Sequence, residues 1–162
     1  MGLEKVLPLE QAYQKVHELK QRGMRVVLTN GCFDLLHPGH VRLFAEASKL
    51  GDVLIVAMNS DASVRALKGN HRALQPEAER AEIIAAMAAV DYVTIFEDAS
   101  VLGVVKRMLP DTLVKGGQYT LDQIVGRDEV ETAGGRVVAI PMVPGYSTSA
   151  IIEAAQRAAA KR

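Results

Sequence analysis

Two histidines in the N-terminal third of the chain are the residues best placed to do chemistry. His37 and His40 stand three residues apart around a Pro-Gly pair, in the stretch TNGCFDLLHPGH. This spacing at the beginning of a helix places both side chains on one face. Imidazole nitrogens can donate hydrogen bonds to phosphate oxygens, bind a metal, or cap a helix end. The surroundings of the pair have to decide between these three roles.

Zinc binding is the weakest of the three interpretations. Helical zinc sites commonly space two histidines four residues apart, and here no cluster of cysteines or carboxylates completes a ligand set. We therefore expect no metal site built from protein ligands. Two histidines that simply cap a helix remain an alternative to phosphate binding.

Composition sets limits on the class of protein. The chain has 162 residues, enough for one domain with a core. Its 19 basic and 19 acidic residues balance, which argues against a nucleic-acid partner. Cys32 is the only cysteine, so no intrachain disulfide forms and a reducing compartment fits. With no long apolar run and no apolar signal segment at the N-terminus, the sequence predicts a cytoplasmic protein without a membrane partner.

The elements that must position the histidines alternate along the chain. Short β-branched runs predict strands, and apolar positions at helical spacing predict helices between them. This alternation predicts an α/β fold, a Rossmann-like doubly wound five-stranded parallel sheet with helices on both faces. We expect one domain, 1–162, with an N-terminal helical extension at 1–24 and the Rossmann-like core at 25–162. The predicted strands are 25–30, 52–59, 92–97, 112–117 and 136–142, and the predicted helices are 8–22, 38–51, 76–90, 99–109, 121–135 and 147–162.

The histidine loop leaves the first predicted strand at the edge where such sheets bind ligands. The helix that follows directs its free N–H groups and partial positive charge to the same place, which favours phosphate. The loop is neither GxGxxG nor GxxxxGK[ST], so it is not a usual dinucleotide fingerprint or a P-loop. The sequence predicts a phosphate site of another type.

TNGCFDLLHPGH resembles the HxGH motif of the nucleotidyltransferase superfamily of cytidylyl- and adenylyltransferases. Further segments occur in the order found in one branch, the D-glycero-β-D-manno-heptose 1-phosphate adenylyltransferases. The resemblance covers roughly residues 25 to 155. The segments are NSDASVRALKGNHRALQPEAER, IFEDAS, LVKGGQY and GYSTSAIIE.

This resemblance implies transfer of AMP from ATP to heptose 1-phosphate, giving ADP-heptose, a precursor of the lipopolysaccharide inner core, and pyrophosphate. It implies Mg²⁺ bound with ATP and a homo-oligomer, a dimer or larger. In many bacteria the domain is fused to a sugar kinase. The attacking phosphate is already ionised, so catalysis is expected to depend on positioning and charge stabilisation rather than on a strong base. The two histidines are then hydrogen-bond donors.

The resemblance also implies roles for particular residues. Catalytic roles fall on His37, His40, Lys68 and Arg80. Nucleotide contacts fall on Thr29, Asn30, Gly31, Cys32, Phe33, Asp34, Gly39, Lys115, Gly116, Gly117, Gln118, Tyr119, Gly145, Ser147 and Thr148. Substrate contacts fall on Asn59, Asp61 and Arg72.

Structural interpretations stay open for several of these residues. Lys68 and Arg72 could be solvated surface residues, and Arg80 could form an ion pair on a helix surface. Ser147 could be an ordinary helix cap, and Asp34 could form an Asx turn. Gln118 stands where relatives carry an aspartate, which affects the details of nucleotide contact.

Two other functions compete with the adenylyltransferase. One is a cytidylyltransferase acting on glycerol 3-phosphate or another polyol phosphate. The other is a nucleotide-binding module without catalysis. The set of cationic and imidazole side chains argues against the module, because binding alone does not require donors to a transition state.

Overall fold

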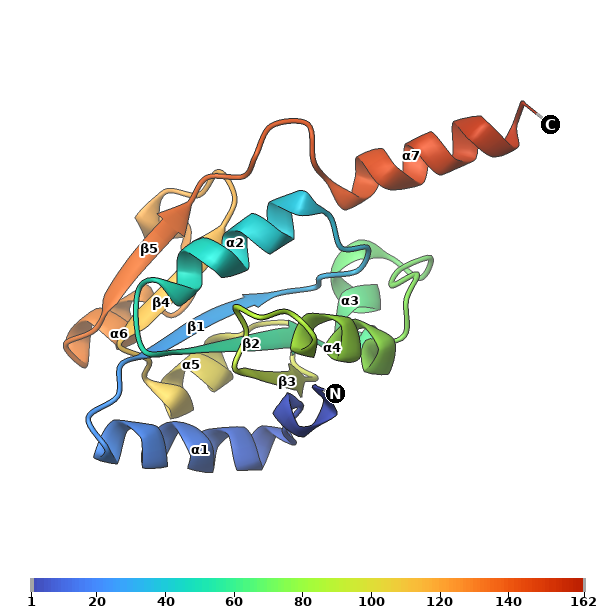
Figure 1. The fold of residues 1–162 in the computed structure, drawn as a ribbon. Helices are drawn as coiled ribbons and strands as arrows, with labels where there is room; N and C mark the ends of the chain where they lie inside the picture. Colours follow the sequence, from blue (N-terminus) through green and yellow to red (C-terminus); the bar gives the residue numbers. More distant parts are fainter. Residues whose placement is uncertain (1, 162) are drawn as a thin grey trace.

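The computed structural model describes residues 2–161 and contains one sheet of five strands (Figure 1). The strands lie in the order β3-β2-β1-β4-β5, and every neighbouring pair is parallel. This confirms the predicted doubly wound parallel sheet. The strands are β1 (Val26–Gly31), β2 (Val53–Asn59), β3 (Tyr92–Phe96), β4 (Thr112–Gly116) and β5 (Arg136–Ile140).

Helices cover both faces of the sheet (Figure 1). One face packs against α1 (Leu9–Gln21), α5 (Leu102–Met108) and α6 (Arg127–Thr132). The other packs against α2 (Pro38–Ser48) and α4 (Glu77–Ala85). Because β2 is covered on both sides, all seven of its residues are buried, which explains its continuous apolar sequence.

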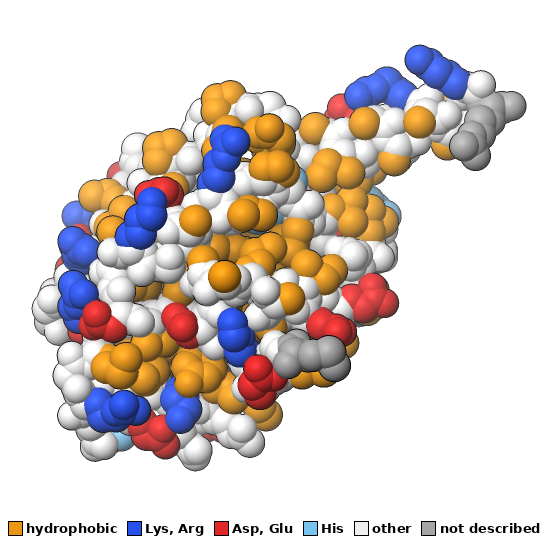
Figure 2. Space-filling view, in the orientation of Figure 1, with side chains coloured by type: hydrophobic (Ala, Val, Ile, Leu, Met, Phe, Trp, Pro, Cys, Tyr) orange, Lys and Arg blue, Asp and Glu red, His pale blue; other side chains and the backbone are white. Residues whose placement is uncertain are grey.

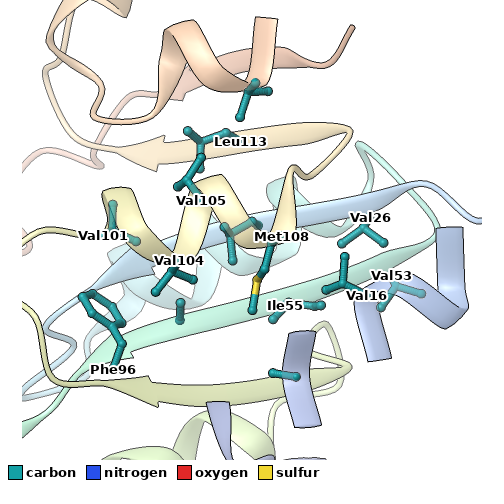
Figure 3. Packing of buried hydrophobic residues seen from close by; sticks show 14 of the residues in the cluster. Val16, Val26, Val53, Ile55, Phe96, Val101, Val104, Val105, Met108 and Leu113 are labelled. Carbon is teal, nitrogen blue, oxygen red and sulfur yellow. The ribbon is translucent and has the colours of Figure 1, made fainter. Parts of the chain in front are cut away.

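The hydrophobic core between the sheet and α1, α5 and α6 joins helices that are far apart in the sequence. Figure 3 shows Val16 of α1, Met108 of α5 and Ile55 of β2 among its members. In α1 the buried residues Ala12, Val16 and Leu19 form one stripe at helical spacing. The N-terminal segment, which also contains a 3₁₀ turn at Leu3–Lys5, is therefore part of the sheet's cover.

Two segments differ from the sequence prediction. Helix α3 (Asp61–Lys68) was not expected; it is only 8 residues long, and only Ser63 and Val64 of its residues are buried. The helix predicted at 121–135 is instead a 3₁₀ turn (Leu121–Gln123) followed by α6. Gly126 separates the two with φ 92°, a left-handed conformation that breaks a helix.

The last helix, α7 (Thr148–Ala159), projects away from the body of the molecule (Figure 1). None of its residues is buried, so it lies outside the packed core that was expected to extend to residue 162. Figure 2 shows apolar side chains along this projecting helix. None of the helices within residues 2–161 combines the length and apolar character needed to cross a bilayer.

Candidate active site

A cavity of about 460 Å³ opens at the carboxyl ends of β1 and β4. The chain proceeds from β1 to β2 on one side and returns to β4 on the other, so this is the point where parallel sheets of this type bind ligands. The volume suits a small-molecule ligand. The predicted site residues that line it are Asn30, Gly31, Cys32, Phe33, Asp34, His40, Asn59, Lys68, Arg72, Lys115, Gly116, Tyr119 and Thr148.

The two histidines stack on each other at the beginning of α2. Their ring centroids lie 3.8 Å apart with an interplanar angle of 23°. His37 is the N-cap residue, and its Nδ1 accepts a hydrogen bond of 3.1 Å from the Gly39 N–H. An accepting Nδ1 places the proton of the neutral ring on Nε2, so His37 has one N–H to donate. Capping and donation to a ligand are therefore compatible in His37.

Burial acts against the charged form of both histidines. Burial lowers the pKa of His37 below its ordinary value. Burial, followed by the nearby His37 and Lys68, lowers the pKa of His40 to about 4. His40 Nδ1 is buried and meets no hydrogen-bond partner within residues 2–161. A polyanion in the cavity would oppose these effects by stabilising the charged imidazole.

Close packing explains the glycines at this end of the sheet. A Cβ on Gly39 would lie 2.9 Å from two atoms of the His37 ring. A Cβ on Gly116 would lie 2.6 Å from the Leu43 side chain, and one on Gly117 would lie 2.6 Å from the Tyr119 ring. The space beside these glycines is thus filled by the protein's own side chains. The ligand contacts expected of them stay predictions.

Arg80 lies behind the cavity wall instead of facing the cavity. Its side chain is completely buried, so the alternative of a surface ion pair is wrong. Its guanidinium donates to the Cys32 carbonyl, and also at 3.0 Å to the carbonyls of Gln75 and Asn59. A fourth bond of 2.6 Å reaches Asp61 Oδ1. In this arrangement Arg80 holds together three segments of chain around the site.

Asp61, expected to contact substrate, is engaged within this network. Besides accepting from Arg80, it accepts from the Glu77 N–H, and its own N–H donates to Glu77 Oε2 at 2.6 Å. Asp61 therefore joins the beginning of α3 to the beginning of α4. Asn59, by contrast, does line the cavity, and its side chain donates to Ser63 Oγ at 2.8 Å.

Two lysines supply positive charge to the cavity. Lys115 Nζ lies 3.4 Å from the Asn30 carbonyl oxygen, a long contact for a hydrogen bond. Burial is the main cause that lowers the pKa of Lys115; Cys32 raises it and Lys68 lowers it further. Neither lysine forms an ion pair with a carboxylate within residues 2–161. The positive charge of these two lysines thus favours binding of an anion in the cavity.

The remaining expected residues lie at the margin. Ser147 Oγ accepts from the Ala150 N–H at 3.0 Å, which confirms its capping role in α7. Thr148 Oγ1 donates to the Leu35 carbonyl at 3.0 Å and so ties the beginning of α7 to the histidine loop. The predicted residues absent from the cavity lining are Thr29, His37, Gly39, Asp61, Arg80, Gly117, Gln118, Gly145 and Ser147.

The cavity also includes residues that the sequence analysis did not select. Residues 99–101 lie in the short segment between β3 and α5, so their position near the carboxyl edge was a signal that could have identified them. Residues 123–125 come from the segment between β4 and α6, where the predicted helix obscured them. The complete additional set is Leu43, Leu67, Ala99, Ser100, Val101, Gln123, Ile124, Val125 and Met142.

Within residues 2–161 no group of three His, Cys, Asp or Glu side chains is arranged to hold a metal ion. The family model described as cytidylyltransferase-like matches residues 28–154. The chain belongs to the cytidylyltransferase-like family. This membership confirms the superfamily resemblance seen in the sequence.

Two bacterial proteins are similar to this chain over most of its length. The chain is 49% identical over 151 residues to the bifunctional protein HldE of Acidiphilium cryptum (strain JF-5), covering 93% of this chain and 31% of that protein. It is 54% identical over 132 residues to the bifunctional protein HldE of Citrifermentans bemidjiense, covering 82% and 27%. The chain therefore spans less than a third of the length of these relatives.

Two solved structures share the fold. The lipopolysaccharide core biosynthesis protein from Thermoplasma volcanium GSS1 has a TM-score of 0.62 at 26% identity, covering 75% of this chain and 98% of that one. The pantoate-β-alanine ligase from Francisella tularensis has a TM-score of 0.61 at 14% identity, covering 84% and 66%. The second likeness concerns the fold alone.

Proposed function

We propose that this chain transfers AMP from ATP to D-glycero-β-D-manno-heptose 1-phosphate, giving ADP-heptose and pyrophosphate for the lipopolysaccharide inner core. The observation that carries the proposal is His40 in the lining of a cavity that also contains Lys68 and Lys115, with His37 stacked on it, in a chain about half identical to HldE proteins. The relatives are bifunctional and much longer, which agrees with the fusion to a sugar kinase that the resemblance implies.

The proposed reaction is a direct displacement at phosphorus. An oxygen of the acceptor's phosphate attacks the α-phosphorus of ATP, the bond to the β-phosphate bridging oxygen breaks, and pyrophosphate leaves with the electron pair. The N–H groups of His37 and His40 would donate to oxygens on which charge develops, and Lys68 and Lys115 would compensate the charge of the leaving group. Such fixed donors stabilise a transition state without needing to reorganise.

Mg²⁺ is proposed to enter with ATP. Asp34 is the only carboxylate among the cavity-lining residues, and its oxygens already accept three hydrogen bonds. The residues of the cavity are therefore compatible with a Mg²⁺ ion whose ligands are phosphate oxygens and water, as is usual for this ion. EDTA without added Mg²⁺ is expected to stop turnover, and a zinc-selective chelator is expected to leave it unchanged.

Pyrophosphate release from ATP or CTP, with a panel of sugar 1-phosphates and glycerol 3-phosphate, tests the proposal. We expect ATP to exceed CTP by at least about tenfold in kcat/KM, equivalent to about 1.4 kcal/mol. A heptose 1-phosphate is the expected acceptor. Equal or better use of CTP with glycerol 3-phosphate would instead establish the cytidylyltransferase, and binding of ATP without turnover would establish the non-catalytic module.

We also propose a cytoplasmic homo-oligomer. ATP is an intracellular substrate, and α7 has apolar side chains that the protomer leaves uncovered, including Ile151 with 38% exposure. A second copy of the chain would remove this surface from water.

A further inference from the structure

Arg72 is a buried arginine held by one side of its guanidinium. Its exposed fraction is 9%, and it lines the cavity. Its Nε donates a hydrogen bond of 2.7 Å to Asp34 Oδ2. Asp34 Oδ1 accepts from the Leu74 N–H at 2.8 Å and the Gln75 N–H at 3.1 Å. One carboxylate therefore fixes both the arginine and the loop that carries it.

The other side of the Arg72 guanidinium is free. Within residues 2–161 neither Nη atom donates to any group, and neither is sealed from solvent inside the protein. Arg80 provides the contrast, because its nitrogens donate to three carbonyls and a carboxylate. Of these two buried arginines, only Arg72 has donors available to a ligand.

The ionisation of Asp34 supports its pairing with Arg72. Burial opposes its ionisation, but bonds from Gln75, Leu74 and Arg72 together hold its pKa below its ordinary value. The Asp34 carboxylate is therefore ionised, and both of its oxygens accept hydrogen bonds from the protein itself. Its charge is matched by Arg72, which leaves Lys68 and Lys115 as unmatched positive charges in the same cavity. An anion that enters meets these donors.

We infer that Arg72 presents its two Nη atoms as a planar fork for a phosphate group, and that Asp34 is the positioning residue that aims the fork. A planar guanidinium matches two phosphate oxygens, and holding it in advance reduces the entropy lost on binding. This assignment rests on the proposed function and gives it a specific phosphate contact. The phosphate is either part of the leaving pyrophosphate or the phosphate of the acceptor.

Arg72→Lys tests the fork. Lysine keeps the charge and can still pair with Asp34, so the loop remains anchored while the two parallel donors are lost. Losing hydrogen bonds to a charged group is expected to raise one KM by about 10- to 100-fold. An increase in the KM for ATP identifies the leaving pyrophosphate, whereas an increase in the KM for the sugar phosphate identifies the acceptor. Arg65→Lys, an exposed position on α3, is the matched control.

Binding measured without turnover separates this inference from the proposed function. Calorimetric titration with inorganic pyrophosphate, and separately with heptose 1-phosphate, is expected to show the same loss of affinity in Arg72→Lys for one of the two ligands. This readout remains available if the chain does not transfer nucleotides. Unchanged affinity for both ligands, with a thermal midpoint equal to that of Arg65→Lys, overturns the inference.

Asp34→Asn tests the positioning role. Its amide oxygen can still accept from the Leu74 and Gln75 N–H groups, but its amide nitrogen would face the Arg72 Nε, donor against donor. We expect the same KM to rise as in Arg72→Lys, with kcat changing less. In an Arg72→Ala background, Asp34→Asn should add little further effect, because Asp34 acts through Arg72. Fully additive effects would show that Asp34 acts independently and would overturn its positioning role.

Discussion

Replacing Arg80 by lysine tests whether this residue holds the site together. The Arg80 guanidinium makes four hydrogen bonds, to the carbonyls of Cys32, Asn59 and Gln75 and to Asp61. These partners belong to the loop after β1, the end of β2, the loop before α4 and the first turn of α3. An ammonium group is a single point with three donors and cannot span this arrangement.

The magnitude follows from the number of bonds lost. Loss of at least two bonds from a charged donor, each contributing about 1.5–3 kcal/mol, predicts about 3–6 kcal/mol of destabilisation. Domains of this size are stable by about 5–15 kcal/mol, so the loss is a large fraction. At about 2–4 °C for each kcal/mol, the thermal midpoint should fall by about 6–24 °C.

Thermal unfolding followed by circular dichroism measures this effect, with urea unfolding as an independent check. Arg65→Lys is the control, since Arg65 is exposed on α3. A direct phosphate contact without a structural role would lower activity and leave the midpoint unchanged. If Arg80→Lys melts within about 2 °C of the control, which is less than the expected effect of one kcal/mol, the positioning role is refuted.

Three further results are expected. His40→Ala and His37→Ala should each reduce turnover by about 10²–10³-fold while ATP binding weakens much less. Because His37 also caps α2, His37→Asn is the control that restores the cap. Near-normal turnover in His37→Asn would show that the role of His37 is structural. The folded state lowers the pKa of His40 to about 4, so its stabilising contribution is complete above about pH 6.5 and is lost as the pH falls toward 4. Between pH 7 and pH 5 the free energy of unfolding, measured with urea, should fall by about 1–2 kcal/mol more in the wild type than in His40→Gln, a range that allows for the partial exposure of His40. The same pH dependence of this free energy in both proteins would contradict the prediction. Ile151→Glu should lower the mass measured by size-exclusion chromatography with light scattering, and an unchanged mass would show that α7 is not an interface.

The order and direction of the main elements could be predicted from local patterns. The apolar runs of β1 and β2 and the stripe of α1 are buried as expected, because burial on both faces leaves a continuous apolar run and burial of one helix stripe leaves a helical period. Helix α3 was missed because its 8 residues make little more than two helical turns, too short a segment for its pattern to stand out. The histidine motif and the topology together predicted a site at the carboxyl edge of the sheet, where the structure has a cavity.

The partners of individual side chains were decided by the tertiary structure. Arg72 and Arg80 are both arginines eight positions apart in one segment, and nothing local distinguishes a free fork from a saturated one. The difference comes from Asp34, Cys32 and Asn59, which folding brings from other parts of the chain. Contacts of this kind depend on how loops meet at the end of the sheet. The sequence determined the sheet, its covering helices and the position of the motif, whereas only packing in three dimensions determined which charged groups face the cavity.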